Sequence, residues 1–429
     1  MTTVTHDSTK PIDMSQVRVD PTWALRIPGS LARRKAVIPC CRINDKVIVA
    51  CTDPDDVNTL DKVERLLHNP IETVIADEES LMLLIENVFG GTTGRNGAVR
   101  MPSPRTGGDE DAVAIVDEIL QAAVIRDASD IHIDPGTDEV KIRFRVDGAL
   151  EVYRQLNIQL HPMVSSRVKV LGGMDIAERR AAQDGRFAWT SVQNREIDVR
   201  AATLPTRNGE SITLRLLASN SNSLTLENLG MSRADLKLFS EAIHKPHGMI
   251  LLTGPTGSGK STTLYGGIKK LISERALHIV TVEDPIEYKI DDVAQVAVDS
   301  ADKVSFAKAL RSILRHDPDV IMIGEIRDAE TADIAIKSSL TGHLVLSTLH
   351  TNSAVNAISR LGDMGVADYL VGATLRLVIA QRLVRRLCPK CREPVELTAA
   401  EAIGLGHPDA AGQTAFVPKG CLYCAGRGM

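Results

Sequence analysis

The sequence predicts a multidomain α/β protein, and three observations carry that prediction. With 429 residues, 43% of them apolar, the chain is too long for one compact domain and can bury several cores. Its middle part alternates apolar and charged residues, which is typical of a half-buried antiparallel sheet. Its C-terminal half contains unbroken apolar runs, which indicate parallel strands buried on both faces. We therefore expect roughly two to four domains.

The overall composition narrows the function classes. The chain carries 50 Lys and Arg against 55 Asp and Glu, so it lacks the basic excess of a protein that coats nucleic acid. Its 6 Phe, 5 Tyr and 2 Trp give little support to single-strand binding by base stacking. No run approaches the roughly 20 apolar residues that span a bilayer, and residues 1–20 lack the apolar core of a signal peptide. We expect a cytoplasmic protein.

The N-terminal part is predicted to contain a flexible tail over residues 1–20 and a small α+β domain over 21–89. The apolar run Val47–Ala50 is typical of a strand, and apolar residues recur at helical spacing across Leu60–Leu67. The six glycines and two prolines of residues 90–110 predict a flexible linker.

A second domain is predicted over residues 111–220. Apolar residues at helical spacing across Val113–Val124 predict a helix, and Val140–Gly148 then alternates apolar and charged residues. The same alternation returns around Val199 and Leu214. Because successive side chains of a strand point to opposite faces, we expect a curved antiparallel sheet with arginines on its polar face.

A third domain, of α/β class, is expected over residues 221–387. Its apolar runs are unbroken, which is typical of strands covered by helices on both sides. The runs are Met249–Leu252, Ile279–Val282, Val320–Ile323 and Leu344–Leu346.

A phosphate-binding loop is predicted at Gly254–Ser261, directly after the apolar run Met249–Thr253. Glycines let consecutive backbone N–H groups face a nucleotide's phosphates, while Lys260 reaches the outer phosphates and the Ser261 hydroxyl ligates Mg²⁺. An ordinary glycine turn is the alternative, which the strand before the motif and the helix after it disfavour. The predicted nucleotide-binding residues are Gly254, Pro255, Thr256, Gly257, Ser258, Gly259, Lys260, Ser261 and Thr262.

A second nucleotide motif is predicted at Val320–Glu325, 65 residues after Lys260. A buried strand that ends in an acid brings a carboxylate to the same magnesium and to the attacking water. A core strand that happens to end in a surface glutamate is the alternative.

Together with two further segments, these motifs resemble the secretion ATPases that drive type II secretion and type IV pilus assembly. Thr281–Glu287 resembles the aspartate box of that family, and Thr341–Asn352 resembles its histidine box. Four segments of the second domain are also similar to the corresponding domain of these motors: Ala128–Pro135, Met174–Arg180, Gln183–Arg186 and Asp198–Arg200.

The resemblance implies a RecA-like ATPase core, a preceding PAS-like sheet domain, and ATP with Mg²⁺ as cofactors. Glu325 or Glu283 would orient the attacking water, and the sequence leaves both open. His343 and His350 would sense the terminal phosphate or hold a carboxylate. Two structural histidines at helix or strand ends are the alternative.

Arg186 and Arg200 are candidate arginine fingers of the second domain. They could reach ATP only if that domain folds over the nucleotide of its own or of a neighbouring subunit. Such residues contribute on the order of 10³–10⁵ in rate. The alternative is a solvated sheet face on which Asp184 and Asp198 pair with them.

The resemblance also implies partners: a homo-oligomeric ring, usually a hexamer, an inner-membrane platform protein and a membrane-anchored adaptor, with the chain peripheral to the inner membrane and no nucleic acid bound. Two alternatives stay open. One is a nucleotide-gated scaffold that does not hydrolyse ATP, and the other is a conjugation or DNA-uptake motor.

Four cysteines predict a structural zinc site in a lobe over residues 388–429. Cys388 and Cys391 form one Cys-x-x-Cys pair, Cys421 and Cys424 form another, and 29 residues separate them. Four thiolates from two tight turns suit a closed tetrahedral Zn²⁺ site. A redox pair is the alternative, although it needs only one such motif. The other three cysteines, Cys40, Cys41 and Cys51, are expected to pack in the core of the first domain.

The two ends of the chain carry weaker expectations. Ile27–Arg34 and Val49–Pro54 resemble the latter half of the first domain of these ATPases, which in some members binds cyclic di-GMP through repeats not visible here. We therefore expect partner docking by that domain. The chain ends five residues after Cys424, whereas the family continues with a helical segment, so a shortened C-terminus is expected.

Overall fold

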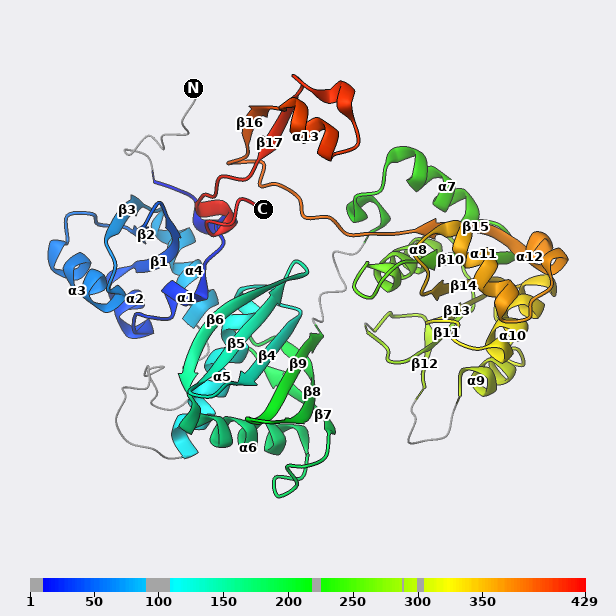
Figure 1. The fold of residues 1–429 in the computed structure, drawn as a ribbon, viewed down its shortest axis with the longest axis horizontal. Helices are drawn as coiled ribbons and strands as arrows, with labels where there is room; N and C mark the ends of the chain where they lie inside the picture. Colours follow the sequence, from blue (N-terminus) through cyan, green and yellow to red (C-terminus); the bar gives the residue numbers. More distant parts are fainter. Residues whose placement is uncertain (1–10, 90–108, 218–224, 288, 299–304) are drawn as a thin grey trace. The chain divides into compact units, whose positions relative to one another are not determined.

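The structure of the chain, a computed structural model, describes residues 11–89, 109–217, 225–287, 289–298 and 305–429. It divides into two compact units (Figure 1). Unit 1 comprises residues 1–219 and 385–429, and unit 2 comprises residues 220–384. Each unit is described by itself below. The predicted linker over 90–110 lies almost entirely outside the described residues.

The first domain of unit 1 is α+β, as predicted. Its three strands lie in the order β1-β2-β3, with β1 antiparallel and β3 parallel to β2. Asp56 caps the helix after β2, because its carboxylate accepts a hydrogen bond from the Thr59 N–H. The elements are η1 (Met14–Gln16), α1 (Pro21–Ala24), α2 (Gly29–Lys35), β1 (Val37–Ile43), β2 (Lys46–Cys51), α3 (Val57–Leu67), β3 (Ile71–Ile75) and α4 (Glu78–Phe89).

The flexible tail predicted over residues 1–20 was wrong for its second half, while residues 1–10 lie outside the described residues. Met14 and Val17 are buried, and the Met14 N–H donates a hydrogen bond to the Ser80 hydroxyl at 3.0 Å. Ile12 also forms a parallel bridge with Ala76. The apolar residues of this segment are spaced too widely to form a run, so their burial depends on distant partners.

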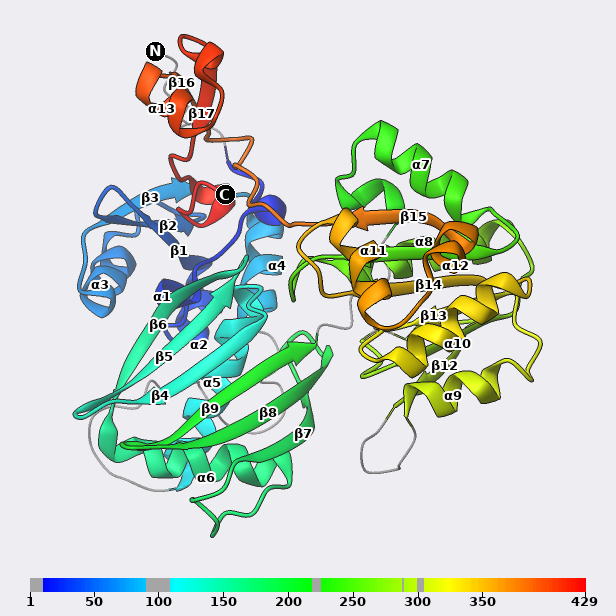
Figure 2. The same ribbon diagram turned by 45° about the vertical axis from the view of Figure 1, so that its right-hand side comes forward.

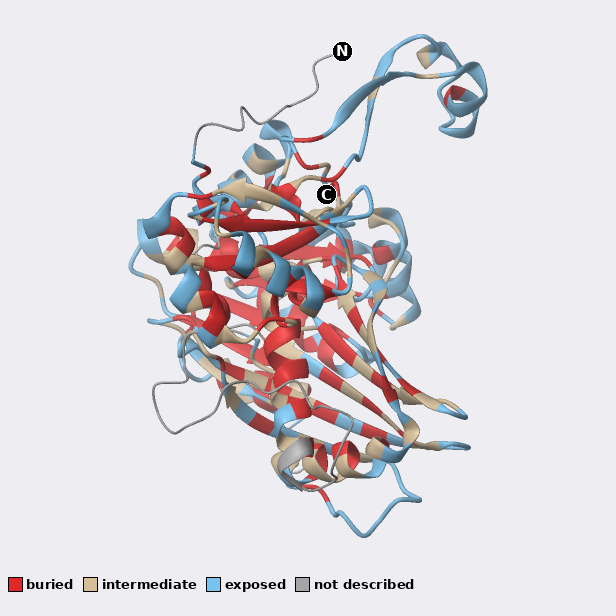
Figure 3. Cartoon of the chain, turned by 90° about the vertical axis from the view of Figure 1, so that its left-hand side faces the viewer, coloured by how far each residue is buried: buried red, intermediate tan, exposed pale blue. Residues whose placement is uncertain are grey.

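The second domain contains the predicted antiparallel sheet, in the order β6-β5-β4-β9-β8-β7. Its apolar face packs on α5 and α6 and forms one continuous core with the first domain, visible as the buried stripes of Figure 3. Gly173 ends α6 in the left-handed conformation, at φ +67°. The elements are α5 (Asp109–Ile125), β4 (Asp130–Pro135), β5 (Glu139–Val146), β6 (Ala149–Asn157), η2 (Ile158–Leu160), α6 (His161–Gly172), β7 (Gln183–Thr190), β8 (Glu196–Thr206) and β9 (Gly209–Leu217).

Unit 2 contains the predicted parallel sheet, in the order β12-β11-β13-β14-β10-β15. Figure 2 shows the helices that surround this sheet. Two separate apolar clusters cover its two faces, which explains the unbroken apolar runs. The helices are η3 (Leu226–Leu229), α7 (Arg233–Ile243), α8 (Lys260–Glu274), α9 (Phe306–Ile313), α10 (Ala329–Leu340), α11 (Ala354–Asp363) and α12 (Asp368–Thr374). The strands are β10 (Gly248–Thr253), β11 (Ile279–Glu283), β12 (Ala294–Ala297), β13 (Val320–Ile323), β14 (Leu344–Leu349) and β15 (Leu375–Ala380).

The C-terminal residues 385–429 return to unit 1. Their short β-ribbon and helix are largely exposed, whereas the last turn is buried. The elements are β16 (Glu393–Glu396), α13 (Ala399–Gly404), η4 (Pro408–Ala410), β17 (Thr414–Val417) and η5 (Leu422–Cys424). Among the described helices of the whole chain, none combines the length and the apolar character that crossing a bilayer requires.

Candidate functional site

The candidate site lies at the carboxyl edge of the parallel sheet of unit 2. Parallel strands end at the same edge, so residues far apart in the sequence meet there. The predicted phosphate loop follows β10, Glu283 ends β11, Glu325 follows β13 and His350 follows β14. The structure thus brings together four of the segments that the sequence analysis singled out.

The phosphate loop has the backbone that its glycines were expected to give. Gly254, Gly257 and Gly259 have φ values of +152°, +74° and +81°, a region that side chains rarely adopt. A Cβ on Gly254 would lie 2.4 Å from the Gln381 carbonyl oxygen, so no larger residue fits there. The Ser258 hydroxyl is buried without a hydrogen-bond partner among the described residues. The loop therefore keeps polar groups available for a phosphate.

Lys260 begins α8 and folds back onto the loop. Its ammonium group donates hydrogen bonds to the carbonyl oxygens of Gly254 at 2.9 Å and of Pro255 at 3.0 Å. Burial lowers the pKa of Lys260, and the negative charges of Glu325 and Glu287 oppose that shift. A lysine held in the loop and flanked by two carboxylates suits a ligand that brings phosphate charge and a divalent cation.

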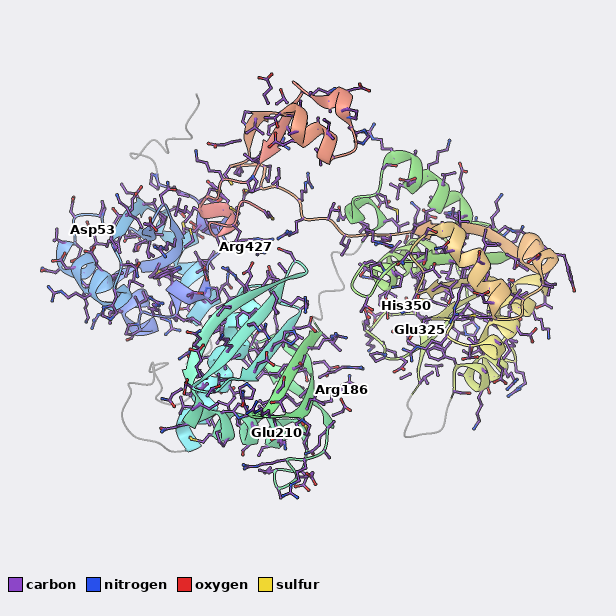
Figure 4. All side chains as sticks on the ribbon, in the orientation of Figure 1. Asp53, Arg186, Glu210, Glu325, His350 and Arg427 are labelled. Carbon is purple, nitrogen blue, oxygen red and sulfur yellow. The ribbon has the colours of Figure 1, made fainter. Side chains whose placement is uncertain are left out.

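Glu325 is held at this edge by a histidine and an arginine. Its side chain is 13% exposed, its Oε2 lies 3.1 Å from His350 Nε2, and its other oxygen contacts the Arg327 guanidinium. Figure 4 shows Glu325 and His350 side by side. The Thr348 hydroxyl fixes the turn by donating to the Gly324 carbonyl at 2.7 Å. His350 is thus placed to hold a carboxylate, as one of its two expected roles required.

Glu283 is buried and fully engaged in hydrogen bonds. The Thr281 hydroxyl donates to its Oε1 at 2.5 Å, Gln295 donates to the same oxygen at 3.1 Å, and the Tyr265 hydroxyl contacts Oε2. Burial, followed by the charge of Glu283, raises the pKa of Tyr265. Because Glu283 is also only 3% exposed, it suits a supporting role better than that of a base.

His343 does not reach the site of its own chain. It precedes β14 and therefore lies at the opposite edge of the sheet from His350. Its Nδ1 lies 3.0 Å from the Ser338 carbonyl oxygen at the end of α10. This position agrees with the structural alternative for that histidine.

Besides Arg327 and Tyr265, sequence reasoning missed three further residues at this edge. Gln381 follows β15 and joins the loop to α8: its amide donates to the Ser258 carbonyl at 2.8 Å and accepts from the Thr263 hydroxyl at 2.9 Å. The Arg382 guanidinium donates to the Asn352 carbonyl at 2.7 Å. The sequence pattern that could have indicated Gln381 and Arg382 is their position as two polar residues directly after an apolar strand.

The third missed residue is Glu287, whose charge acts on Lys260. The sequence reasoning chose the first glutamate of Thr281–Glu287 and passed over the last. Its signal was the second carboxylate of the same segment, four residues after Glu283. The Glu287 N–H donates to the Tyr265 hydroxyl at 3.3 Å, so the two glutamates share one tyrosine.

The second domain carries its arginines on the polar face of the sheet, as predicted. Strand register places Arg186 beside Arg200, and Arg200 beside Arg215. Arg186 is 63% exposed and its Nε donates to Asp198 at 2.8 Å, the pairing that the alternative reading expected. The Nε of Arg200 is buried and has no hydrogen-bond partner among the described residues. Arg215 is likewise paired, with Asp130 at 2.9 Å, so within this row it is Arg200 that keeps an Nε for an anion.

Gly185 allows β7 to approach α6, directly before Arg186. A Cβ on Gly185 would lie 2.4 Å from the Gly172 carbonyl oxygen. Because the backbone cannot shift without cost, a larger residue at this position would push β7 away from α6.

The four cysteines of the predicted metal site meet in unit 1. Their sulfurs all lie within 4.8 Å of one another, with 3.9 Å between Cys388 and Cys421 and 3.8 Å between Cys391 and Cys424. Four sulfurs about 2.3 Å from one Zn²⁺ would be about 3.8 Å apart, so the set fits a tetrahedral ion. These separations are far longer than a disulfide bond of about 2 Å.

The remaining three cysteines pack in the core of the first domain, as expected. Cys40, Cys41 and Cys51 are all buried. Burial raises the pKa of Cys51 to about 11 and that of Cys41 to about 12, so both stay thiols near neutral pH.

Comparison with known proteins agrees with these features. The profile of the family described as type II/IV secretion system protein matches residues 106–429, and the MshEN domain profile matches residues 8–95. The type II secretion system protein E of Pseudomonas aeruginosa is 41% identical over 418 residues, which cover 93% of this chain and 83% of that protein.

Two further comparisons point the same way. The type IV pilus assembly ATPase PilB of Myxococcus xanthus is 39% identical over 437 residues, covering 97% of this chain and 77% of that protein. The X-ray structure of the Legionella pneumophila ATPase DotB is similar with a TM-score of 0.54 and 27% identity, covering 66% of this chain and 79% of that one.

Proposed function

The chain belongs to the type II/IV secretion system protein family, and from this premise we propose that it is a motor that hydrolyses ATP to power type II protein secretion or type IV pilus assembly. One observation carries the proposal. The phosphate loop, its lysine and the carboxylate of Glu325 meet at one edge of a single parallel sheet in unit 2. This is the arrangement that phosphoryl transfer to water needs.

In the proposed site, residues 254–262 bind the phosphates of ATP through backbone N–H groups, and Lys260 neutralises the outer phosphates. The Ser261 hydroxyl and a carboxylate hold Mg²⁺, which neutralises charge as the phosphoryl group transfers. Glu325 and Glu287 supply the carboxylates for the ion and the water, because their charges reach Lys260. His350 orients Glu325, and the buried Glu283 holds the segment Thr281–Glu287 in place through its hydrogen bonds.

The motor works as a ring of identical subunits, for which a hexamer is the family expectation. Arg186 and Arg200 act as arginine fingers toward the ATP of one subunit in that ring. The unpartnered Nε of Arg200 supports an anion there, whereas Arg186 must first leave Asp198. An exposed ion pair of this kind contributes only about 0–1 kcal/mol, so that exchange costs little.

The ring is cytoplasmic and peripheral to the inner membrane, where a platform protein and a membrane-anchored adaptor receive its motion. The first domain, over residues 21–89, docks such a partner. Some of its basic residues already pair with carboxylates of the same domain, Arg33 with Glu86 at 3.0 Å and Lys35 with Asp56 at 2.9 Å. No nucleic acid is bound, in keeping with the net charge of -5.

The tetracysteine site, within residues 388–429, holds a structural Zn²⁺. Four cysteine ligands leave no open position, so the ion stabilises the turn and takes no part in hydrolysis. The proposed domains are the first domain at 21–89, the second at 111–220, the ATPase domain at 221–387 and this lobe.

Phosphate release and nucleotide binding by the full chain test the proposal. Lys260→Ala should abolish binding of a fluorescent ATP analogue. Glu325→Gln should bind it normally but release phosphate about 100-fold more slowly or worse, because a carboxylate that orients water contributes at least that much. Lys337→Ala is the matched control, since Lys337 pairs with Asp333 on the exposed face of α10.

One outcome would favour the alternative hypothesis of a nucleotide-gated scaffold that does not hydrolyse ATP. If the wild-type ring binds the analogue with platform protein present, and phosphate release is unchanged by Glu325→Gln, the site gates without hydrolysis.

A further inference from the structure

The last turn of the chain makes contacts that a metal site does not require. The turn Cys421–Gly428 is closed by its own hydrogen bonds: the Gly428 N–H donates to Cys424 Sγ at 3.1 Å, and the Gly428 carbonyl accepts from the Cys388 N–H at 2.9 Å. Folding of this turn therefore fixes the positions of the cysteine sulfurs and of the side chains that lie between and after these cysteines.

The side chains of the turn join the core of the two N-terminal domains. Leu422 and Ala425 are 4% and 8% exposed and belong to the same apolar cluster as β1 and β5. Gly426 brings the backbones into contact, because a Cβ there would lie 2.7 Å from the Arg42 carbonyl oxygen on β1. The turn is thus a packed element of unit 1.

Arg427 adds a charged contact to the second domain. Its Nη2 lies 2.7 Å from Asp147 Oδ2, at the tip of the β5–β6 hairpin, and its Nε lies 3.8 Å from Glu151 Oε1 on β6. The side chain is only 16% exposed. Figure 4 shows Arg427 above that hairpin.

The charged contact continues into the first domain. Arg126 on the second domain lies 3.1 Å from Glu151 and 3.0 Å from Asp20, which precedes α1. Arg126 is 15% exposed and Asp20 13%. The Arg126–Asp20 pair is shielded on both sides, so solvent screens it less than a surface pair, whereas Glu151 is 36% and Asp147 50% exposed. A chain of alternating charges therefore joins the last turn, the second domain and the first domain.

We propose that the turn Cys421–Gly428 is a metal-dependent latch that fastens the first and second domains to the C-terminal lobe through Leu422, Ala425 and Arg427. The same folded turn both completes the metal site and makes these contacts, so metal binding and docking stabilise each other reciprocally. Loss of the ion releases the turn from β1 and from the β5–β6 hairpin.

Hydrogen exchange of the full chain, zinc-loaded and after chelation, tests the latch. Exchange should rise on chelation in residues 385–429, in the peptide that contains Arg42–Lys46 and in the β5–β6 peptide that contains Asp147, while α8 of unit 2 stays unchanged. A rise confined to residues 385–429 would overturn the proposal. Failure of the chain to take up zinc would overturn it as well.

Zinc affinity, measured by competition with a chromophoric chelator, tests the reciprocal effect. Arg427→Ala and Asp147→Asn should each weaken zinc binding by about 5- to 150-fold, the usual range of coupling between two sites. The double charge swap Arg427→Asp with Asp147→Arg should restore part of that loss.

Lys419→Ala is the matched control, because Lys419 pairs with Glu393 inside the lobe and should leave the affinity unchanged. If Asp147→Asn binds zinc as tightly as wild type, the latch is wrong. This readout is independent of ATP hydrolysis, so failure of the proposed motor function would not affect it.

Discussion

Tyr265 links the two glutamates of the segment after β11. Its hydroxyl contacts Glu283 and accepts a hydrogen bond from the Glu287 N–H at 3.3 Å, and its ring, on α8, is buried. Glu287 acts on Lys260, whereas Glu283 is enclosed. The tyrosine therefore transmits the position of a buried carboxylate to an exposed one.

We expect Tyr265→Phe to lower kcat about tenfold or more and to leave the ATP affinity nearly unchanged. A hydrogen bond to a charged group contributes about 1.5–3 kcal/mol, and here its loss frees the segment that carries Glu287. Steady-state phosphate release against ATP concentration separates the two constants. Tyr153→Phe is the control, because that hydroxyl binds Glu118 in unit 1. Equal kcat values for both variants would contradict the positioning role.

Single residues were predictable where the motif itself imposes geometry. The glycines of the phosphate loop and the four metal-site cysteines could be read from spacing, since backbone conformation and tetrahedral coordination restrict which residues fit. Gln381 could not, because its contact with Ser258 depends on β15 pairing beside β10. Glu287 had a visible signal, but choosing it over Glu283 required knowing which carboxylate is enclosed.

At the scale of elements, burial on both faces made the central strands readable. β10, β11, β13 and β14 all appear as unbroken apolar runs, whereas the edge strands β12 and β15 are only partly buried and were not predicted. The alternating strands of the second domain were also predicted from burial, because only one face of that sheet packs on α5 and α6 and the other face carries polar residues.

Helix α6 of the second domain should make that domain sensitive to acid. His161 begins the helix, is 6% exposed, and its Nε2 lies 2.8 Å from the Glu210 carbonyl oxygen. Burial lowers its pKa below the usual 6.5, and Arg179 acts in the same direction, while Glu210 opposes both. Lys169 pairs with the Glu210 carboxylate beside it.

We expect the free energy of unfolding of unit 1 to fall as the pH drops below about 6.5. There the unfolded chain binds a proton at His161 that the folded chain refuses, so the stability present above pH 6.5 is progressively lost. Urea unfolding at pH 7.5, 6.5 and 5.5 measures the effect. His161→Gln should have a shallower pH dependence than wild type, and an unchanged slope would contradict the assignment.

At the scale of the whole molecule, the chain forms two compact units, and unit 1 is built from two stretches of sequence that flank unit 2. Residues 385–429 pack with the N-terminal domains, although they follow the ATPase domain directly. The cysteine spacing predicted the metal set, but not the core that Leu422 and Ala425 join, because the rest of that core comes from Ile12 to Leu214, much earlier in the chain.

Arg186 and Arg200 lie on unit 1, whereas the phosphate loop lies on unit 2, so their proposed role can be tested by mutation. If Arg200 stabilises the transferring phosphoryl group, Arg200→Ala should lower phosphate release by the assembled ring on the order of 10³-fold while nucleotide binding persists. Arg186→Ala should do the same, whereas Asp198→Asn should keep full turnover, because it only frees Arg186. Turnover within a few-fold of wild type in both arginine variants would make this a solvated sheet face. If the arginines do act on ATP, rings mixed from Lys260→Ala and Arg200→Ala subunits should regain activity only where the arginine of one subunit serves the ATP of its neighbour. Within a single subunit, neither variant has a complete site.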